Sequence, residues 1–464
     1  MKNIAIAITD GVGYRNFVLN GFLEKLSSQF NHIYVFSAIP IKYFDKLDDS
    51  QYTIIELLDY KEPKITWFYR KLKEVAHLRN HKKGNFAISR LWVLNKNKNL
   101  NFRGFLTRLV FFITEFLNSE KWILYFNTKQ KMSIKKLKVY NYYNYLFKKH
   151  QIDLMFFTHQ RPPYIAPLVY VAEDYGIKTS TFIFSWDNLA SKGRMAAEFD
   201  EYFVWSELMK NDLKEFYKNV KSDRIHIVGT PQFETYRLKD FYSSKSDFLS
   251  YFKLNPAFKT ITYSCGDSSV AKNDPYYIDI IAFAISNNQI EKVNFIVRTS
   301  PADDGKRFQP LVKKYPFISW NFPDWNNEDQ GHSQAWSQRI PTKKDLINLQ
   351  SILRYSDLGI NMCSTMSIDF MLFDKPVINP VMGTGDGDLA NDQKFLKFPH
   401  YKTVVESNSV DFAKSPDQLI QLIAKNLSSP LDKKEQRIKL RELQIGQPLE
   451  NTSERIVDKL ENIG

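Results

Sequence analysis

The segment Ile4–Ala38 reads IAIAITDGVGYRNFVLNGFLEKLSSQFNHIYVFSA. It opens with an apolar run typical of a buried strand, which is followed by a turn containing Gly11 and Gly13. Apolar residues at helical spacing cover Asn16–Gln29, and a second apolar run covers His32–Ala38. A strand, a helix and a second strand in this order form a βαβ unit, which predicts a parallel sheet.

The same alternation continues along the chain. Further strands are expected at 154–158, 179–184, 201–204, 224–228, 260–264, 293–298, 317–321, 358–362 and 376–380, most of them separated by helical patterns. The pattern predicts an α/β protein with two Rossmann-like domains, residues 1–230 and 231–430, and C-terminal helices at 431–464 that pack back toward the first domain. Open α/β sheets bind ligands at the carboxyl ends of their strands, so we expect two such sheets to face each other across a cleft.

Composition excludes several classes of protein. The 464 residues are 43% hydrophobic and 25% charged, which is typical of a globular protein. Two cysteines are too few for a disulfide scaffold and fit a reducing compartment. The first apolar run is interrupted by Asp10 and reads as a strand, and no uncharged run approaches the roughly 18–20 residues that cross a bilayer. A cytoplasmic protein, soluble or peripheral on the inner face of the membrane, is expected.

The positive charge is concentrated in one segment. The chain carries a net charge of +13, and residues 61–150 contain 21 Lys and Arg against 4 Asp and Glu. This segment is also rich in Trp, Tyr and Phe, and it has helical periodicity with few turn signals. We therefore expect a basic, aromatic, helical insertion within the first domain.

In the second half, the loop after 358–362 is suited to a phosphate. It reads CSTMSID over Cys363–Asp369 and places Ser364 and Thr365 at the start of a predicted helix. Free backbone N–H groups and the helix dipole favour an anion at such a position. Asp369, one turn further on, is placed to accept hydrogen bonds from ribose hydroxyls. The alternative is an ordinary N-cap with a helix carboxylate.

Two other loops of the second half are also donor-site candidates. Ser264 ends the strand 260–264, and Gly266 and Ser268 follow it. Glycine lets the backbone approach a ligand, and serine hydroxyls suit phosphate oxygens, although a polar turn explains them equally. Arg298 ends the strand 293–298 and is a candidate partner for a donor phosphate, or for an ordinary salt bridge.

In the first half, the loop after 179–184 is dense in recognition residues. It contains Trp186, Asp187, Asn188 and Lys192, and such polar side chains are costly to bury without partners. This density favours a sugar or acceptor site, with Asp187 as a candidate catalytic carboxylate. A surface loop with an exposed tryptophan is the alternative.

Two further post-strand residues are candidate general bases. Asp10 follows the first strand, and His159 follows 154–158, where an imidazole titrates near neutral pH. Arg15 and Asn16 follow Asp10 and are candidates for acceptor binding. Turn chemistry explains Asp10-Gly11 equally, and an isolated histidine is often structural. The sequence GVGY is not a complete GxGxxG fingerprint, and the histidines lack zinc-site spacing.

This layout resembles the GT-B glycosyltransferases, which have two Rossmann-like domains with the nucleotide-sugar mainly on the C-terminal one. The stretch CSTMSIDFMLFDKPVIN at 363–379 looks like the diphosphate-binding loop and helix of that family, and similar strings occur in CDP-glycerol glycerophosphotransferases and UDP-N-acetylglucosamine 2-epimerases. The strings FSWDNL, VWSE and VGTPQF, the last containing Gly229, look like bacterial surface-polysaccharide transferases. The insertion at 61–150 departs from the basic pattern.

The resemblance implies roles for individual residues. Ser364 and Thr365 would hold the diphosphate, Asp369 the ribose and Arg298 a phosphate, with Gly229 also on the donor side. A base after the first strand falls on Asp10, because the histidine usual at that place is absent. The family usually lacks an essential metal, so neither a metal nor a permanently bound cofactor is expected, and a nucleotide-sugar serves as co-substrate.

The expected reaction is transfer of a sugar to a hydroxyl of a lipid-linked or cell-surface glycan acceptor. Transfer from a CDP-polyol and non-catalytic binding of lipid or nucleic acid are the rival functions. The basic aromatic insertion suits an anionic membrane surface, where Lys and Arg meet headgroups and aromatic rings settle at the interface. Nucleic acid is the weaker alternative because no RNA-binding signature accompanies the charge. A solvated basic face over an aromatic core also explains the composition.

Overall fold

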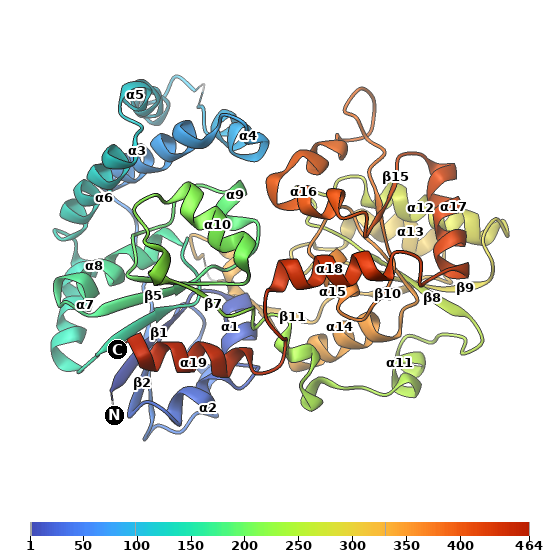
Figure 1. Cartoon of the computed structure of the whole chain (residues 1–464), viewed down its shortest axis with the longest axis horizontal. Helices are drawn as coiled ribbons and strands as arrows, with labels where there is room; N and C mark the ends of the chain where they lie inside the picture. Colours follow the sequence, from blue (N-terminus) through green and yellow to red (C-terminus); the bar gives the residue numbers. More distant parts are fainter. Residues whose placement is uncertain (1, 98, 330, 464) are drawn as a thin grey trace. The chain divides into compact units, whose positions relative to one another are not determined.

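The computed structural model describes residues 2–97, 99–329 and 331–463, and the chain divides into two compact units (Figure 1). Unit 1 comprises residues 1–234, 328–338 and 444–464, and unit 2 comprises 235–327 and 339–443. The first crossing between the units, at 234–235, is close to the predicted boundary at 230. The return of 328–338 to unit 1 was not predicted from the sequence.

Unit 1 is built on a seven-stranded parallel sheet with the order β3-β2-β1-β4-β5-β6-β7. The strands are β1 Asn3–Ile8, β2 His32–Ser37, β3 Tyr52–Glu56, β4 Leu154–Phe157, β5 Lys178–Phe182, β6 Glu201–Val204 and β7 Ile225–Ile227. The helices flanking this sheet are α1 Gly11–Phe17, α2 Phe22–Ser27, α8 Ala166–Asp174, α9 Asn188–Ser191, α10 Glu207–Phe216 and α19 Thr452–Ile463. The predicted α/β class is confirmed.

Helices cover both faces of this sheet, which explains why its strands are almost uniformly apolar. Phe156 of β4 packs against Phe17 of α1 and Phe22 of α2. Phe36 of β2 packs against Tyr143 of α7, Lys138–Lys149. The strand register aligns Phe36 with the neighbour of Phe156 rather than with Phe156 itself, so the two rings point to opposite faces.

The first helix begins earlier than its apolar spacing predicted. Asp10 is its N-cap, because the Asp10 carboxylate accepts a hydrogen bond from the backbone N–H of Gly13, and α1 starts directly at Gly11. The predicted continuous helix Asn16–Gln29 is wrong. Gly21 has a φ of +80°, a conformation that suits glycine, and it separates α1 from α2.

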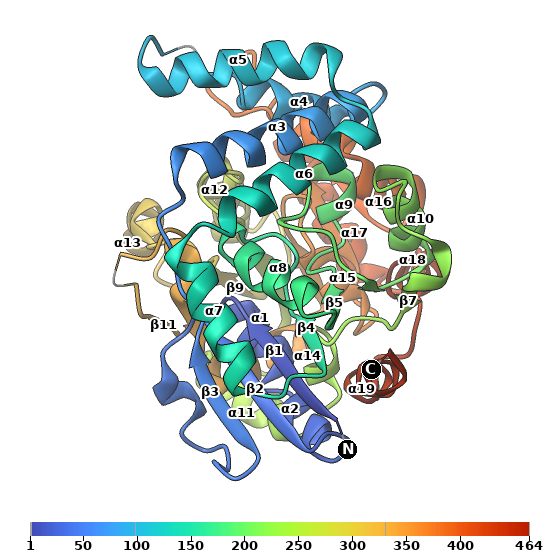
Figure 2. The same cartoon turned by 90° about the vertical axis from the view of Figure 1, so that its left-hand side faces the viewer.

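The segment 61–150 is helical, as expected, and forms a layer on unit 1. Its helices are α3 Lys64–His81, α4 Phe86–Leu94, α5 Phe102–Phe116, α6 Glu120–Ile134 and α7. Figure 2 shows α3, α4 and α6 between the sheet and α5, which is the outermost helix of the layer. Buried polar bonds anchor the layer to the loop after β5: Lys73 donates to the carbonyl of Ala196 at 2.7 Å, and Asn85 donates to the carbonyl of Ala190 at 2.8 Å.

Unit 2 contains a six-stranded parallel sheet with the order β10-β9-β8-β13-β14-β15. Its strands are β8 Lys259–Ser264, β9 Val293–Arg298, β10 Ser319–Asn321, β13 Leu358–Ile360, β14 Val377–Pro380 and β15 Asp411–Ala413, with a short antiparallel pair β11 Trp325–Asn327 and β12 Arg339–Pro341. Its helices are α11 Lys245–Tyr251, α12 Asp274–Ser286, α13 Gln309–Lys314, α14 Lys343–Tyr355, α15 Met366–Met371, α16 Pro399–Glu406, α17 Pro416–Ser428 and α18 Lys434–Ile445.

The C-terminal helices behave differently from one another. The structure places α19 in unit 1 and most of α18 in unit 2, where Arg437 is buried and its guanidinium pairs with Asp374 at 3.1 Å. Within the described ranges, no helix combines the length and the apolar character needed to cross a bilayer.

Candidate functional site

The strand order of unit 1 reverses between β1 and β4, and the candidate bases lie at that point. Strands added after β1 run to one side through β2 and β3, and the chain then crosses to β4 on the other side. Loops at the carboxyl ends of two such strands diverge and leave room for a ligand. Asp10 follows β1 and His159 follows β4, so the topology places both at this switch point.

The two side chains form a buried dyad. Nδ1 of His159 lies 3.0 Å from Oδ2 of Asp10, and both residues are buried. Thr9 donates its hydroxyl to the same carboxylate oxygen at 2.7 Å, and the Gly13 N–H binds the other oxygen at 2.8 Å. With Nδ1 engaged, Nε2 at the opposite side of the imidazole is the nitrogen left for a substrate.

The electrostatics of the dyad favour a charged carboxylate beside a neutral imidazole. Burial opposes ionisation of Asp10, but the hydrogen bond and charge of His159 outweigh it and hold the pKa of Asp10 below its usual range. Burial lowers the pKa of His159 against the opposing effect of Asp10. At neutral pH the imidazole is therefore unprotonated and able to accept a proton.

A cavity of about 390 Å³ adjoins His159. Its lining residues come from the helical layer, from the loops after β4 and β5, and from the segment 328–338: Arg70, Lys71, Glu74, Leu78, Leu91, Asn95, His159, Arg161, Pro162, Pro163, Gly193, Arg194, Gln334 and Trp336. The His159 ring is stacked on Phe184 at a centroid distance of 4.0 Å and meets the edge of Trp336 at 6.2 Å. These contacts fix the orientation of the imidazole.

Arg161 is a functional candidate that the sequence did not single out. It lines the cavity, yet its guanidinium has no hydrogen bond or ion pair with any described residue, and its Nη1 is buried. Burial lowers the pKa of Arg161. The neighbouring cations are neutralised, since Arg70 pairs with Glu62 at 2.6 Å and Arg194 pairs with Glu198 at 2.9 Å. Arg161 is therefore available for an anionic group of a ligand.

The loop after β5 is more buried than a surface loop. Trp186 and Asn188 are buried, so the predicted alternative of an exposed tryptophan is wrong. Asn188 accepts a hydrogen bond from Gln160 at 3.1 Å and donates to Asp187 at 3.0 Å. Lys192 pairs with Asp187 at 3.3 Å, which occupies both side chains. This loop supports the residues around His159, and its assignment to an acceptor and that of Asp187 to catalysis stay predictions.

The remaining first-loop residues are tied to one another. Arg15 donates through Nε to the side chain of Asn16 at 2.9 Å, and Asn16 is buried within α1. Neither lines the cavity beside His159. Their proposed contact with an acceptor stays a prediction.

Unit 2 has its own switch point between β8 and β13. The register pairs Tyr263 with Ile360, so Ser264 and Asn361 occupy the next positions at the carboxyl edge. Both are buried, and the Ser264 hydroxyl and the Asn361 Nδ2 are buried atoms without a hydrogen-bond partner in the described structure. Unpaired polar atoms at a switch point indicate a binding site, and Asn361 was missed because asparagine carries no motif of its own.

Asn361 also shapes the loop that follows. Its Oδ1 accepts hydrogen bonds from the N–H and hydroxyl of Ser364, each at 3.0 Å, and from the hydroxyl of Ser367 at 3.1 Å. Ser364 and Thr365 are partly exposed, as a ligand contact requires. The predicted strand end at Met362 falls at Ile360 instead, and the helix begins at Met366. With six residues, α15 is too short for its dipole to carry the anion site, so any diphosphate contact rests on the side chains and loop N–H groups.

Asp369 and Arg298 are engaged inside unit 2. Asp369 is buried and accepts the hydroxyl of Tyr236 at 2.5 Å. Arg298 is buried, and its guanidinium binds both carboxylate oxygens of Asp345, at 3.0 and 2.8 Å, as well as Asn321. The structure therefore favours the salt-bridge alternative for Arg298 over a phosphate contact.

The glycines and Ser268 complete the predicted donor residues. The N–H of Gly266 donates to Asp274 at 2.9 Å, and a Cβ on Gly266 would meet Ala271 at 2.7 Å, so close packing within the loop requires this glycine. Ser268 is exposed. Gly229 lies in unit 1 with a φ of +80°, where a Cβ would meet Gln447 at 3.2 Å. This packing argues against the donor-side assignment of Gly229.

Across the described residues, no group of three or more His, Cys, Asp and Glu side chains is arranged to hold a metal ion. The expectation that catalysis needs neither a metal nor a bound cofactor stays a prediction.

Solved structures share this architecture over the whole chain. The S. aureus MnaA–UDP complex aligns with a TM-score of 0.54 at 10% identity, covering 100% of this chain and 97% of that one. A putative UDP-N-acetylglucosamine 2-epimerase from Listeria monocytogenes aligns with a TM-score of 0.56, also at 10% identity, covering 100% of this chain and 97% of that one. The chain has the GT-B fold. Arabidopsis thaliana UGT89C1 complexed with quercetin aligns at 0.50 and 12% identity over 99% of both chains.

At these identities the likeness concerns the fold alone. Neither a protein-family model nor a curated protein sequence matches the chain. None of the three structures is described as a CDP-glycerol glycerophosphotransferase, and that finer resemblance stays a prediction.

Proposed function

We propose that this GT-B protein is a glycosyltransferase that moves a sugar from a nucleotide-sugar to a hydroxyl group of a lipid-linked or cell-surface glycan acceptor. The observation that carries the proposal is the buried Asp10–His159 pair at the switch point of unit 1, beside a cavity. A neutral imidazole oriented by a carboxylate is a suitable base for an acceptor hydroxyl.

In the proposed reaction, the acceptor oxygen attacks the anomeric carbon of the donor sugar. The bond from that carbon to the diphosphate oxygen breaks, and the nucleoside diphosphate leaves with the electron pair. Nε2 of His159 takes the hydroxyl proton, and the charged Asp10 stabilises the imidazolium that forms. This assigns the base to His159, and Asp10 is its positioning residue.

Unit 2 is the proposed donor-binding unit. Ser264 and Asn361 supply unpaired polar atoms at the carboxyl edge, and Ser364 and Thr365 supply partly exposed hydroxyls in the adjoining loop. These groups suit diphosphate oxygens. The nucleotides named with the similar structures make UDP-sugars the first donors to test.

The proposed acceptor carries a negative charge near its reactive hydroxyl. Arg161 supports this proposal because it is the cation of the cavity that has no partner among the described residues. A sugar linked through phosphate to a lipid has this chemistry, and the basic layer 61–150 favours an anionic membrane surface as the place where the acceptor is met. We accordingly place the enzyme on the cytoplasmic face of a membrane.

The decisive experiment measures nucleoside diphosphate release from UDP-, GDP- and CDP-sugars and from CDP-glycerol, with lipid extracts as acceptor source. His159→Ala should abolish acceptor-dependent release. His226→Gln is the matched control, because His226 forms a similar pair with Glu201 at 2.8 Å but does not line the cavity.

Each rival function has its own outcome. Turnover of CDP-glycerol alone would indicate a polyol-phosphate transferase. Conversion of the donor into an epimer without any acceptor would contradict transfer. Absence of turnover and of nucleotide-induced thermal stabilisation would leave a non-catalytic binding protein. Ser364→Ala combined with Thr365→Ala should reduce that stabilisation, and an unchanged shift would remove these two residues from the donor site.

A further inference from the structure

Helix α5 carries a continuous apolar stripe that faces away from the protein. Its members are Phe102, Phe105, Leu109, Phe112 and Phe116, and each is between 36% and 71% exposed. They alternate at spacings of three and four residues, which places them on one side of a helix. Soluble proteins rarely leave such a row of phenylalanines in water, so this stripe indicates an interaction surface.

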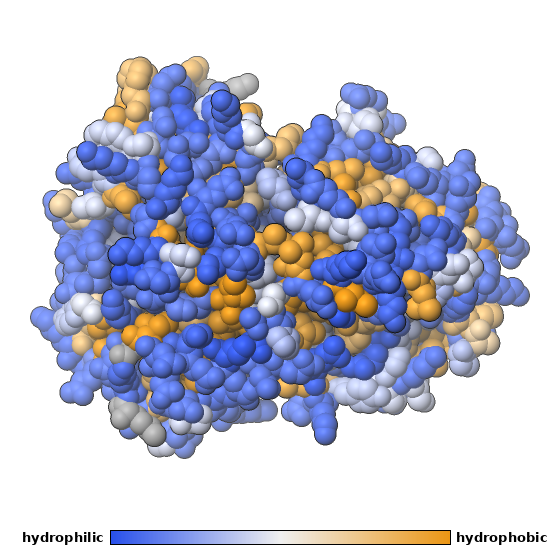
Figure 3. Space-filling model, viewed as in Figure 1, coloured by the Kyte–Doolittle hydropathy of each residue, from blue (hydrophilic) through white to orange (hydrophobic). Residues whose placement is uncertain are grey.

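The opposite side of α5 holds it on the protein. Val110 and Thr114 are buried, and Val110 belongs to a small apolar core with Leu72 of α3 and Ile123 of α6. Figure 2 shows α5 lying along the outside of α3, and Figure 3 shows apolar residues at the free end of this layer. The inner side is thus satisfied by its own core, and the stripe is a second, unpartnered apolar side.

The charges around the stripe are positive. Arg103 and Arg108 are exposed on α5, whereas its acidic residue Glu115 is paired with Arg79 at 3.6 Å. The nitrogen of Lys64 lies 4.8 Å from the centroid of the Phe102 ring. Two copies packed stripe to stripe would bring these cations together, which is unfavourable, whereas an anionic surface would attract them.

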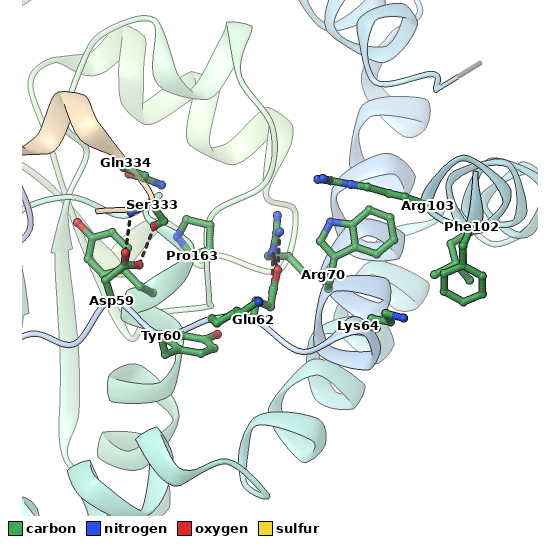
Figure 4. Close-up of a pocket in the computed structure, with 14 residues that line it drawn as sticks. Asp59, Tyr60, Glu62, Lys64, Arg70, Phe102, Arg103, Pro163, Ser333 and Gln334 are labelled. Carbon is green, nitrogen blue, oxygen red and sulfur yellow. Dashed lines mark hydrogen bonds and ion pairs between the residues drawn. The ribbon is translucent and has the colours of Figure 1, made fainter. Parts of the chain in front are cut away.

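A cavity of about 670 Å³ opens beside the first turn of α5 (Figure 4). Phe102, Arg103 and Lys64 gather at one end of it, and the guanidinium of Arg103 lies 5.7 Å from the centroid of the Trp67 ring. Neither Lys64 nor Arg103 forms an ion pair with a described residue, whereas Arg70 deeper in the cavity is neutralised by Glu62. Aromatic walls with unpaired cations suit a phosphate joined to an apolar chain.

We propose that α5 attaches the protein to an anionic lipid bilayer, with the phenylalanine stripe entering the headgroup region and Lys64 and Arg103 binding lipid phosphates at the mouth of this cavity. An amphipathic helix with an apolar face bordered by cations binds a bilayer in this way. The proposal deepens the membrane partner proposed above. The cavity also shares Arg70, Pro163 and Gln334 with the cavity beside His159, so a lipid-linked acceptor would enter next to the base.

The test measures co-flotation of the full-length protein with vesicles of phosphatidylcholine, with and without phosphatidylglycerol. Phe105→Asp combined with Phe112→Asp should lower vesicle binding at least tenfold, because two charges would enter the apolar stripe. Phe283→Asp is the matched control, since Phe283 is 52% exposed on α12 of unit 2 and should leave binding unchanged. Lys64→Gln with Arg103→Gln should remove most of the gain from phosphatidylglycerol.

The contrary results are equally defined. Wild-type protein that fails to float with anionic vesicles would overturn the proposal, as would a stripe variant that floats like wild type. If the wild-type protein is a dimer that the stripe variant dissociates, the stripe is a self-association surface instead. Thermal melting establishes that the stripe variant is folded.

Nucleotide-sugar turnover in detergent-free solution separates this proposal from the proposed enzymatic function. The stripe residues Phe105 and Phe112 line neither cavity, so their substitution should leave turnover of a water-soluble acceptor intact. Conversely, His159→Ala should abolish turnover and leave vesicle binding intact. Failure of one proposal therefore does not imply failure of the other.

Discussion

Nδ1 of His159 and Oδ2 of Asp10 are 3.0 Å apart, although 149 positions separate the two residues in the chain. Strands β1 and β4 are neighbours in the sheet, so the residues that follow them meet at its carboxyl edge. This contact turns two isolated polar residues into an oriented base, and the first predictions concern it.

Asp10→Asn should lower kcat by about 10²–10⁴-fold while the protein still folds. The amide keeps the shape of the carboxylate but cannot stabilise an imidazolium. Steady-state turnover of the nucleotide-sugar measures the effect, and the melting temperature reports on folding. A variant that retains wild-type kcat would show that the pair is structural.

The pH dependence of kcat/KM should have an acidic limb. Burial lowers the pKa of His159 below 6.5, so activity should be complete at neutral pH and fall as protonation removes the base below pH 6.5. Because Asp10 opposes this lowering, Asp10→Asn should move the limb to still lower pH. A limb above pH 7, or one that Asp10→Asn does not move, would contradict the assignment.

Arg161→Leu should reduce transfer without destabilising the protein. The wild-type guanidinium has no partner among the described residues, so its removal costs no ion pair and relieves a desolvated charge. We expect an unchanged or higher melting temperature together with an increased KM for an anionic acceptor. A lower melting temperature with unchanged KM would assign Arg161 a structural role.

Arg298→Met should act on stability more than on donor binding. It would leave the buried Asp345 without its cation, which costs about 3–5 kcal/mol for a buried pair. Chemical denaturation measures this cost. Lys306→Met, which breaks the exposed Lys306–Asp304 pair, is the control and should cost at most about 1 kcal/mol. A stable Arg298→Met protein that no longer binds UDP would restore the phosphate assignment.

Acid should destabilise unit 1 through two histidines of α3. Burial lowers the pKa of His77, whose two ring nitrogens have no partner among the described residues, and it lowers the pKa of His81 to about 4. Both are bases with depressed folded-state pKa values. Their neutral forms therefore leave stability intact above pH 6.5, and stability is lost as pH falls from 6.5 toward 4.

His77→Leu combined with His81→Leu should flatten this loss, so that melting temperatures at pH 7 and pH 5 lie closer together than in the wild type. His32→Gln serves as the control, because His32 is partly buried and already bonded to Thr53 at 2.8 Å. Equal acid sensitivity in the wild type and the double variant would exclude these histidines as the cause.

The sequence by itself determined the two α/β series, the helical character of 61–150 and the post-strand positions of Asp10, His159 and Ser364, because hydrophobic periodicity and loop position are local properties. It also placed the concentration of basic charge. Only the tertiary structure decided which polar residues meet. Arg298 and Asp369 lie after or near strand ends like the others, but long-range partners, Asp345 and Tyr236, engage them internally.

The same limit explains what was missed. Arg161 became a candidate only once its lack of a partner was visible, and the exposure of the α5 stripe depended on which of its two apolar sides packed against α3. Apolar spacing tells that a helix has an apolar side but cannot tell whether the protein covers it. Pairing and coverage depend on residues far away in the chain, which are brought together only when the sheet and its helices assemble.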